Sequence, residues 1–255
     1  MLINASYIIA IPTYNRYKEL NNKTLNLLHN YEIDKKQIYI FVANEEEEVI
    51  YKNNINPEYY HKIIVGELGI RNQRKFISKY FPEGQRIVSM DDDIEKILEF
   101  VKTNHWTELK PVYDLNNLIN YFFSYCIKEN IYLWGVYPVN NVRWLSEKIR
   151  TDLRFIIGVF HGYINRHDED LYPDIKCIVK EDIEQSILFY KKDLKILRFE
   201  KYSFKTKFNA VGGLGQDRFE GNKLAQDYLC ETYPDICKRK FRKNGMPEIR
   251  LVQPK

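Results

Sequence analysis

The stretch Arg86-Ile-Val-Ser-Met-Asp-Asp-Asp93 places three consecutive carboxylates directly after a short apolar run. The run is typical of a buried β-strand, and the acids would repel one another unless a cation neutralised them. Alternate residues of an extended segment point the same way, so Asp91 and Asp93 can share a site while Asp92 points elsewhere. Such hard oxygen ligands suit Mg²⁺ or Mn²⁺. The alternative is an acidic helix N-terminus, because Ile94–Leu98 could begin a helix; the preceding strand favours the metal site.

On either side of this stretch, short apolar runs alternate with polar stretches of helical periodicity. The sequence predicts strands at Tyr7–Ile11, Gln37–Val42, Lys62–Val65 and Arg86–Met90, and helices at Lys18–Tyr31 and Ile70–Tyr80. Further along it predicts helices at Leu115–Ile127 and Val179–Tyr190, and strands at Ile131–Val136, Phe155–His161 and Leu194–Phe199. This alternation predicts an α/β fold with a mixed, mainly parallel sheet and helices on both faces.

Polar residues follow three of these strands. In an open α/β sheet, ligands bind beyond the carboxyl ends of the strands. The loop Pro12-Thr13-Tyr14-Asn15-Arg16, Asn44 and Asp91–Asp93 all lie at such ends, so we expect them to converge on one site. Arg16 could make a bidentate contact with a phosphate or a base. The alternative is an ordinary strand–turn–helix with Thr13 or Asn15 as its N-cap.

Basic residues stand at the start of the predicted helix in Gly69-Ile-Arg71-Asn-Gln-Arg74-Lys75. Positive charge there opposes the helix macrodipole, and a bound diphosphate would reverse that repulsion. A binding role is therefore favoured for Arg71 and Arg74.

Two later motifs carry further candidates. The acids of Lys180-Glu181-Asp182 could supply a base that takes a proton from a hydroxyl group, or they could simply cap a helix. The Gly-rich turn at Gly212 and Gly213 follows Lys205 and Lys207, which favours anion binding. This turn matches neither the Rossmann fingerprint nor the P-loop.

The charge is unevenly distributed along the 255 residues, whose formal net charge is +4. Residues 191–255 carry 16 Lys/Arg against 8 Asp/Glu, whereas residues 1–190 carry 23 against 27. We therefore predict a core at residues 1–200 and a basic extension at 201–255 that is packed on it. Its cations suggest a polyanionic partner, although a solvated tail is the alternative. The cluster considered for this contact is Lys238, Arg239, Lys240, Arg242 and Lys243.

Other classes of protein are disfavoured. The apolar content of 44% is too high for a disordered chain, and the longest apolar runs are far shorter than a membrane span. The opening residues lack the pattern of a secretory leader. None of the four cysteines forms a C-x-x-C pair, which argues against a zinc site and predicts reduced thiols in a cytosol.

Taken together, the motifs resemble the GT-A family of nucleotide-sugar glycosyltransferases over roughly residues 7–190. In that family a Pro-x-Tyr-Asn-Arg loop and a GxRNxR-type segment hold the nucleotide, a D-x-D motif binds Mn²⁺ or Mg²⁺, and a later Glu-Asp pair supplies the base of inverting members. More narrowly, Gly69-Ile-Arg-Asn72, Met90–Asp93, Lys180–Asp182 and the Gly-rich turn resemble the TET/JBP-associated DNA glycosyltransferases of phages and viruses. These place a sugar on 5-hydroxymethylpyrimidines.

The resemblance implies a UDP-sugar donor held by Arg71, Arg74 and the Thr13–Arg16 loop. It places Asp91 on the ribose or sugar, Asp93 on the metal, and Asp182 as the base, with Glu181 the weaker candidate. Double-stranded DNA would be the acceptor; a glycan, lipid or protein acceptor, or a non-enzymatic nucleotide- or DNA-binding module, are the alternatives. One departure is that many members have a late histidine as a third metal ligand, whereas the last histidine here is His167.

Overall fold

The computed structural model of the chain describes residues 6–174, 179–206 and 218–254. The strands are β1 (Tyr7–Pro12), β2 (Ile38–Val42), β3 (Lys62–Val65), β4 (Arg86–Met90), β5 (Lys96–Lys102), β6 (Thr107–Pro111), β7 (Leu133–Val136), β8 (Ile149–Arg150), β9 (Phe160–Ile164), β10 (Leu197–Phe199), β11 (Tyr202–Lys205), β12 (Cys237–Phe241) and β13 (Pro247–Leu251). The α-helices are α1 (Tyr17–Leu20), α2 (Asn26–Asn30), α3 (Glu45–Asn54), α4 (Ile70–Tyr80), α5 (Leu115–Glu129), α6 (Glu181–Asp193) and α7 (Arg218–Thr232). A π-helical turn, Asn21–Leu25, joins α1 to α2.

The central sheet has the strand order β3-β2-β1-β4-β9-β7-β10-β8. Strands β3, β2, β1 and β4 are parallel to one another, and β7 is parallel to β10. Strand β9 is antiparallel to both β4 and β7, and β8 is antiparallel to β10. The predicted mixed, mainly parallel α/β sheet is confirmed.

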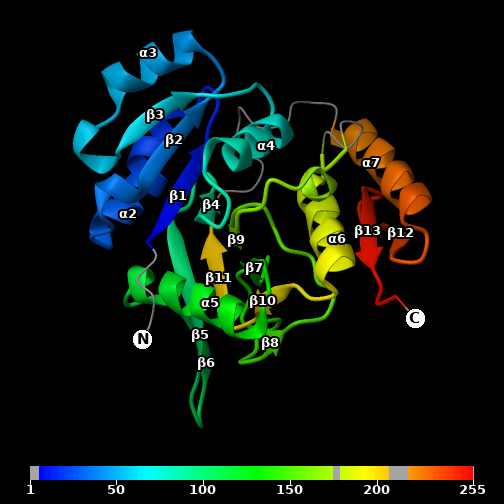
Figure 1. The fold of residues 1–255 in the computed structure, drawn as a ribbon. Helices are drawn as coiled ribbons and strands as arrows, with labels where there is room; N and C mark the ends of the chain where they lie inside the picture. The colour runs from blue at the N-terminus through cyan, green and yellow to red at the C-terminus, as the bar shows by residue number, and fades with distance from the viewer. Residues whose placement is uncertain (1–5, 175–178, 207–217, 255) are drawn as a thin grey trace.

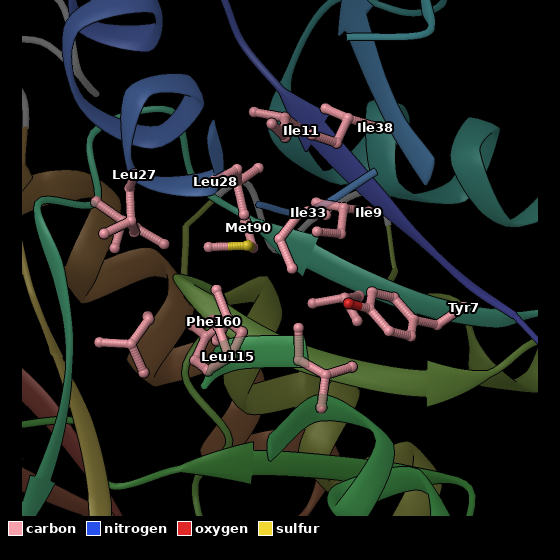
Figure 2. Packing of buried hydrophobic residues seen from close by; sticks show 14 of the residues in the cluster. Tyr7, Ile9, Ile11, Leu27, Leu28, Ile33, Ile38, Met90, Leu115 and Phe160 are labelled. Carbon is pink, nitrogen blue, oxygen red and sulfur yellow. The ribbon is translucent and has the colours of Figure 1, made fainter. Parts of the chain in front are cut away.

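Helices cover both faces of this sheet, so its central strands are buried on both sides. Along β1, Tyr7, Ile9 and Ile11 pack into one apolar cluster with residues of α2 and α5. Figure 2 shows part of this cluster, where Leu28 and Leu115 lie near Met90 of β4. The alternate residues Ile8 and Ala10 belong to a second cluster, built with α4, α6 and α7. This period of two places each side chain on one face or the other.

Two smaller sheets flank the central one. Strands β11, β5 and β6 form an antiparallel sheet whose β5–β6 hairpin projects from the body of the molecule (Figure 1). Strands β12 and β13 form a hairpin that packs beside α7, beyond α6 (Figure 1). Leu229 of α7 and Ile249 of β13 join the same apolar cluster as Ile187 of α6. The division at residue 200 stays a prediction. No helix in the described part of the chain is long and apolar enough to cross a membrane.

Two sequence expectations are corrected. The predicted strand at Phe155–His161 is wrong over residues 155–159, because β9 begins only at Phe160. In that loop the N–H of Ile156 donates to Ser186 Oγ at 2.9 Å, and the N–H of Gly158 donates to Asp182 Oδ2 at 3.1 Å. The apolar loop is thus satisfied by α6 instead of by a neighbouring strand. The acidic run also begins no helix, since β5 follows it.

Candidate functional site

A pocket of about 480 Å³ opens where β1 and β4 end and where α4 and α6 begin. Residues from six separated segments line it, and most of them belong to the motifs singled out in the sequence. The predicted site residues that line the pocket are Pro12, Thr13, Tyr14, Arg16, Arg74, Asp91, Asp92, Glu181 and Asp182. The crossover topology therefore brings together residues up to 170 positions apart in the chain.

Arg16 ties the first loop to the acidic run. Its guanidinium lies 2.9 Å from Asp92 Oδ1 and 2.6 Å from Asp93 Oδ2. The Thr13 hydroxyl donates to Asp92 Oδ2 at 2.7 Å and lies 2.8 Å from the Tyr51 hydroxyl of α3. Burial raises the pKa of Asp92 to about 6, although Arg16 and Thr13 oppose the shift. Two of the three consecutive acids are thus committed to contacts within the protein.

Asp91 lines the pocket and differs from Asp92 and Asp93 because its side chain is the most exposed of the three. Its backbone is fixed: the N–H donates to Val159 O at 2.9 Å and the carbonyl accepts from Thr24 Oγ1 at 2.7 Å. Its side chain is 34% exposed, and its Oδ1 lies 3.5 Å from Arg74 Nη2. Burial raises the pKa of Asp91 to about 7, against the attraction of Arg74 and with the help of nearby Asp92.

Arg74 joins the two carboxylate groups across the pocket. Its guanidinium donates to Glu181 Oε1 at 2.6 Å and to the carbonyl of Gly158 at 2.9 Å. Asp182 lies beside this pair and accepts a hydrogen bond from the N–H of Gly158. Burial, with the charge of adjacent Glu181, raises the pKa of Asp182 to about 7. Because Arg74 holds Glu181, the contacts are consistent with Asp182 as the predicted base of the pair, and its role stays a prediction.

The pocket offers few protein ligands to a divalent metal. Within the described ranges, no group of three or more His, Cys, Asp or Glu side chains is arranged to hold a metal ion. Asp93 is bonded to Arg16 and Thr206, which leaves Asp91 as the member of the predicted metal pair that lines the pocket. Mg²⁺ commonly takes one or two carboxylates and completes its shell with substrate phosphates and water. The residues fit a metal held in that way, with Asp91 as its protein ligand.

Three predicted nucleotide-site residues, and the predicted metal ligand Asp93, lie elsewhere or have other partners. Asn15 has a left-handed φ of 54° and its N–H donates to Glu47 Oε1. Asn44 caps α3, where its side chain accepts from the N–H of Glu47 at 2.9 Å. Arg71 donates to the carbonyl of Asp174 at 3.0 Å and does not line the pocket. Together with Asp93, these roles stay predictions.

The basic residues predicted to contact an acceptor lie away from the pocket. Lys205 pairs with Glu95 at 3.0 Å. The five cations predicted for this contact are all exposed on the β12–β13 hairpin; these are Lys238, Arg239, Lys240, Arg242 and Lys243. Of these, Arg239 pairs with Asp227 and Arg242 pairs with Glu248. Lys207, Gly212 and Gly213 lie outside the described residues.

Sequence reasoning missed two residues that line the pocket and fix the position of its walls, Gln73 and Gly158. Gln73 is buried, and it donates to Val42 O at 3.0 Å while accepting from the N–H of Glu67 at 2.8 Å. Gly158 contacts Arg74 so closely that a Cβ there would lie 2.4 Å from Nη2. The glycine inside an apolar run was the one available signal for this loop, because a glycine there often marks close backbone approach.

Comparison with known proteins supports the fold. Neither a protein-family model nor a curated protein matches the sequence. A mannosyltransferase from Pyrobaculum calidifontis, solved with GDP-Man and Mn²⁺, matches with a TM-score of 0.54 and 12% identity over 90% of this chain, which spans 64% of that chain. Glucosyl-3-phosphoglycerate synthase from Mycobacterium tuberculosis, solved with Mn²⁺, UDP and phosphoglyceric acid, matches with a TM-score of 0.45 and 8% identity, covering 99% of this chain and 88% of that one. At such identities the first likeness shows a shared fold, the GT-A arrangement that the motifs predict.

Proposed function

We propose that the protein is a nucleotide-sugar glycosyltransferase that uses a divalent metal. One observation carries the proposal: a single pocket joins the loop after β1, Asp91, Arg74 and the base candidate Asp182. The mannosyltransferase that shares the fold was solved with a nucleotide sugar and Mn²⁺. The donor of this chain is proposed to be a UDP-sugar.

The donor would lie along the pocket between the Thr13–Arg16 loop and the start of α4. Ligands sit at this edge of open α/β sheets, where the strand ends leave a crevice. The N-terminus of α4, beginning after Gly69, presents free N–H groups that favour an anion. Mn²⁺ or Mg²⁺, held by Asp91 and the diphosphate, would supply charge neutralisation for the leaving UDP.

The transfer follows from the place of Asp182. The acceptor hydroxyl oxygen bonds to the anomeric carbon as its proton passes to the Asp182 carboxylate. The bond from the anomeric carbon to the diphosphate oxygen breaks, and UDP leaves with that electron pair. A single displacement of this kind inverts the anomeric centre. A raised pKa suits a general base that works near neutral pH.

The acceptor is proposed to be the hydroxymethyl group of a 5-hydroxymethylpyrimidine in DNA. The exposed cations of β12 support a polyanionic acceptor, because lysine and arginine bind phosphates by charge and release counterions. Reaching the base in a duplex would require extruding it from the stack. A cytosolic site of action, predicted from the cysteine pattern, belongs to the same proposal.

The deciding experiment incubates the purified protein and Mn²⁺ with a panel of UDP-sugars and hydroxymethylated duplex DNA, followed by nucleoside mass spectrometry. A hexose added to the hydroxymethyl nucleoside is expected. Asp182→Asn should abolish that product while UDP-sugar binding, measured by calorimetry, is retained. Equal loss of binding and transfer would refute the role of Asp182, and transfer only to glycans, lipids or proteins would refute the DNA acceptor.

A further inference from the structure

A second cavity, of about 1160 Å³, adjoins the first at Glu181 and Asp182, which line both. Its walls come from the loop around Phe155, the start of α6 and strand β13. The proposed base therefore stands where the two cavities meet. A carboxylate in that position can take a proton from a hydroxyl in the second cavity while a sugar occupies the first.

Half-buried apolar side chains line part of the second cavity. Phe155 and Ile157 come from the loop, and Met246 and Leu251 come from the hairpin. None of the four is completely covered by the protein. A flat ring placed against them would remove apolar surface from water, which is worth about 25 cal/mol per Å².

The cations that line this cavity differ in how they are paired. Lys180 pairs with Glu248 at 2.7 Å, Arg154 with Asp152 at 2.7 Å and Arg198 with Glu200 at 2.6 Å. Arg250 is exposed and makes no ion pair with any residue that the structure describes. Its positive charge is therefore available at the wall of the cavity.

A second cation adds to this charge. Arg250 stands directly opposite Lys238 in the β12–β13 ladder. Side chains directly opposite each other in an antiparallel pair lie on the same face, and like charges placed so are destabilising. An anion bound between the two would reverse that repulsion. Arg250 lines the cavity, and Lys238, which donates to Pro234 O at 2.9 Å, stands beside it at the edge of the cavity.

We propose that the second cavity is the acceptor site, and that it takes a phosphate-bearing nucleoside unit of a polynucleotide. The ring lies against Phe155 and Leu251, the phosphate lies against Arg250 and Lys238, and the hydroxyl group points to Asp182. This assignment rests on the proposed glycosyl transfer. It adds Arg250, Phe155 and Leu251 to the residues that select the acceptor.

One contact couples the acceptor wall to the base. Lys180, the residue before Glu181, has a left-handed φ of 64°, and its Nζ lies 2.7 Å from Glu248 Oε1 on β13. Both side chains are largely buried, at 10% and 20% exposure. The hairpin and the first turn of α6 are thereby held together, so an acceptor bound on β13 is presented to Asp182 at a defined position.

The test is charge reversal at Arg250. R250E is expected to keep its fold, because it places an acid opposite Lys238. Its matched control is K195E, which makes the same charge change at an exposed lysine that lines neither cavity. Thermal unfolding by circular dichroism establishes that both variants fold, and R250Q replaces R250E if the latter does not.

Two measurements separate this inference from the proposed function. Fluorescence anisotropy measures binding of a short labelled oligonucleotide that carries one 5-hydroxymethylpyrimidine, and calorimetry measures binding of the UDP-sugar. R250E should weaken oligonucleotide binding at least tenfold and leave UDP-sugar binding unchanged, whereas K195E should change neither. Equal oligonucleotide binding by R250E and K195E, or binding of anionic phospholipid vesicles in place of the oligonucleotide, would overturn the assignment. Oligonucleotide binding that depends on Arg250 without any transfer would support the site and refute the glycosyltransferase.

Discussion

Replacing Arg74 by methionine removes the cation that joins Asp91 to Glu181. Methionine keeps much of the length of the arginine stem and takes away the guanidinium, whose neighbours lie 2.6 Å (Glu181), 2.9 Å (Gly158 O) and 3.5 Å (Asp91) away. Removing one partner of a buried ion pair costs about 3–5 kcal/mol, since the remaining charge is left without compensation. Because the Asp91 side chain is 34% exposed, water screens part of its uncompensated charge. We therefore expect the free energy of unfolding to fall by about 3 kcal/mol, the lower end of that range.

The loss of folding stability caused by Arg74→Met should depend on pH in a defined direction. Arg74 lowers the pKa values of Asp91 and Asp182, so without it these two pKa values in the folded state rise further above their values in the unfolded chain. A raised folded pKa stabilises the protein at low pH, and that stabilisation is lost as the pH rises through it. The deficit of Arg74→Met should therefore be smaller at about pH 5.5 than at about pH 8.

The assay is urea unfolding followed by circular dichroism at both pH values. For a chain of this size, 3 kcal/mol corresponds to a fall in Tm of roughly 6–12 °C. Arg143→Met is the matched control, because Arg143 is exposed and should change stability by less than about 0.5 kcal/mol. Adding Glu181→Gln to Arg74→Met should recover part of the loss. A deficit as small as that of the control, or one that is equal at both pH values, would refute this reasoning.

Four further outcomes are expected. Gly158→Ala should displace Arg74, because the added Cβ would lie 2.4 Å from Arg74 Nη2. The KM for the donor should then rise about tenfold, which corresponds to about 1.4 kcal/mol of binding free energy. An unchanged KM in steady-state kinetics would contradict this expectation. Gly66→Ala brings its Cβ 2.0 Å from Gln73 Oε1, so calorimetry should show weaker UDP-sugar binding, and native affinity would speak against it. Transfer should rise with pH through about 7 as Asp182 ionises, whereas a flat kcat/KM profile would exclude it as the base. EDTA should abolish transfer and added Mn²⁺ restore it; full activity in EDTA would argue against the metal.

Where local signals were strong, the sequence predicted elements to the residue. Strands β3 and β4 and helix α4 have the predicted bounds, because turn residues such as Pro82 and Gly84 end the runs of periodic side chains. The loop at residues 155–159 was predicted as a strand because burial by α6 and burial in a sheet leave the same apolar composition. Apolar composition alone does not reveal which backbone partners a segment finds.

The candidate site, like the fold, was predicted in part from the sequence. Sequence position placed Pro12, Asp91 and Asp182 at the ends of elements that topology then brought together. The partners of individual side chains depended on contacts between distant segments. Asn44 precedes a run of four glutamates, and in the structure it caps the helix that they begin. That capping pattern was present in the sequence, but the position of Asn44 after a predicted strand favoured a ligand-binding role instead.

The bidentate contact of Arg16 with Asp92 and Asp93 implies that the three aspartates have unequal roles. Alanine substitution at either of these two positions would remove one of the two carboxylates that hold the Arg16 guanidinium and register mainly as lost thermal stability. Substitution of Asp91 would leave that contact intact and register as lost turnover. A scan of this acidic run scored by activity alone would report three essential residues; scored by stability as well, it would separate two that shape the loop from one that meets the substrate.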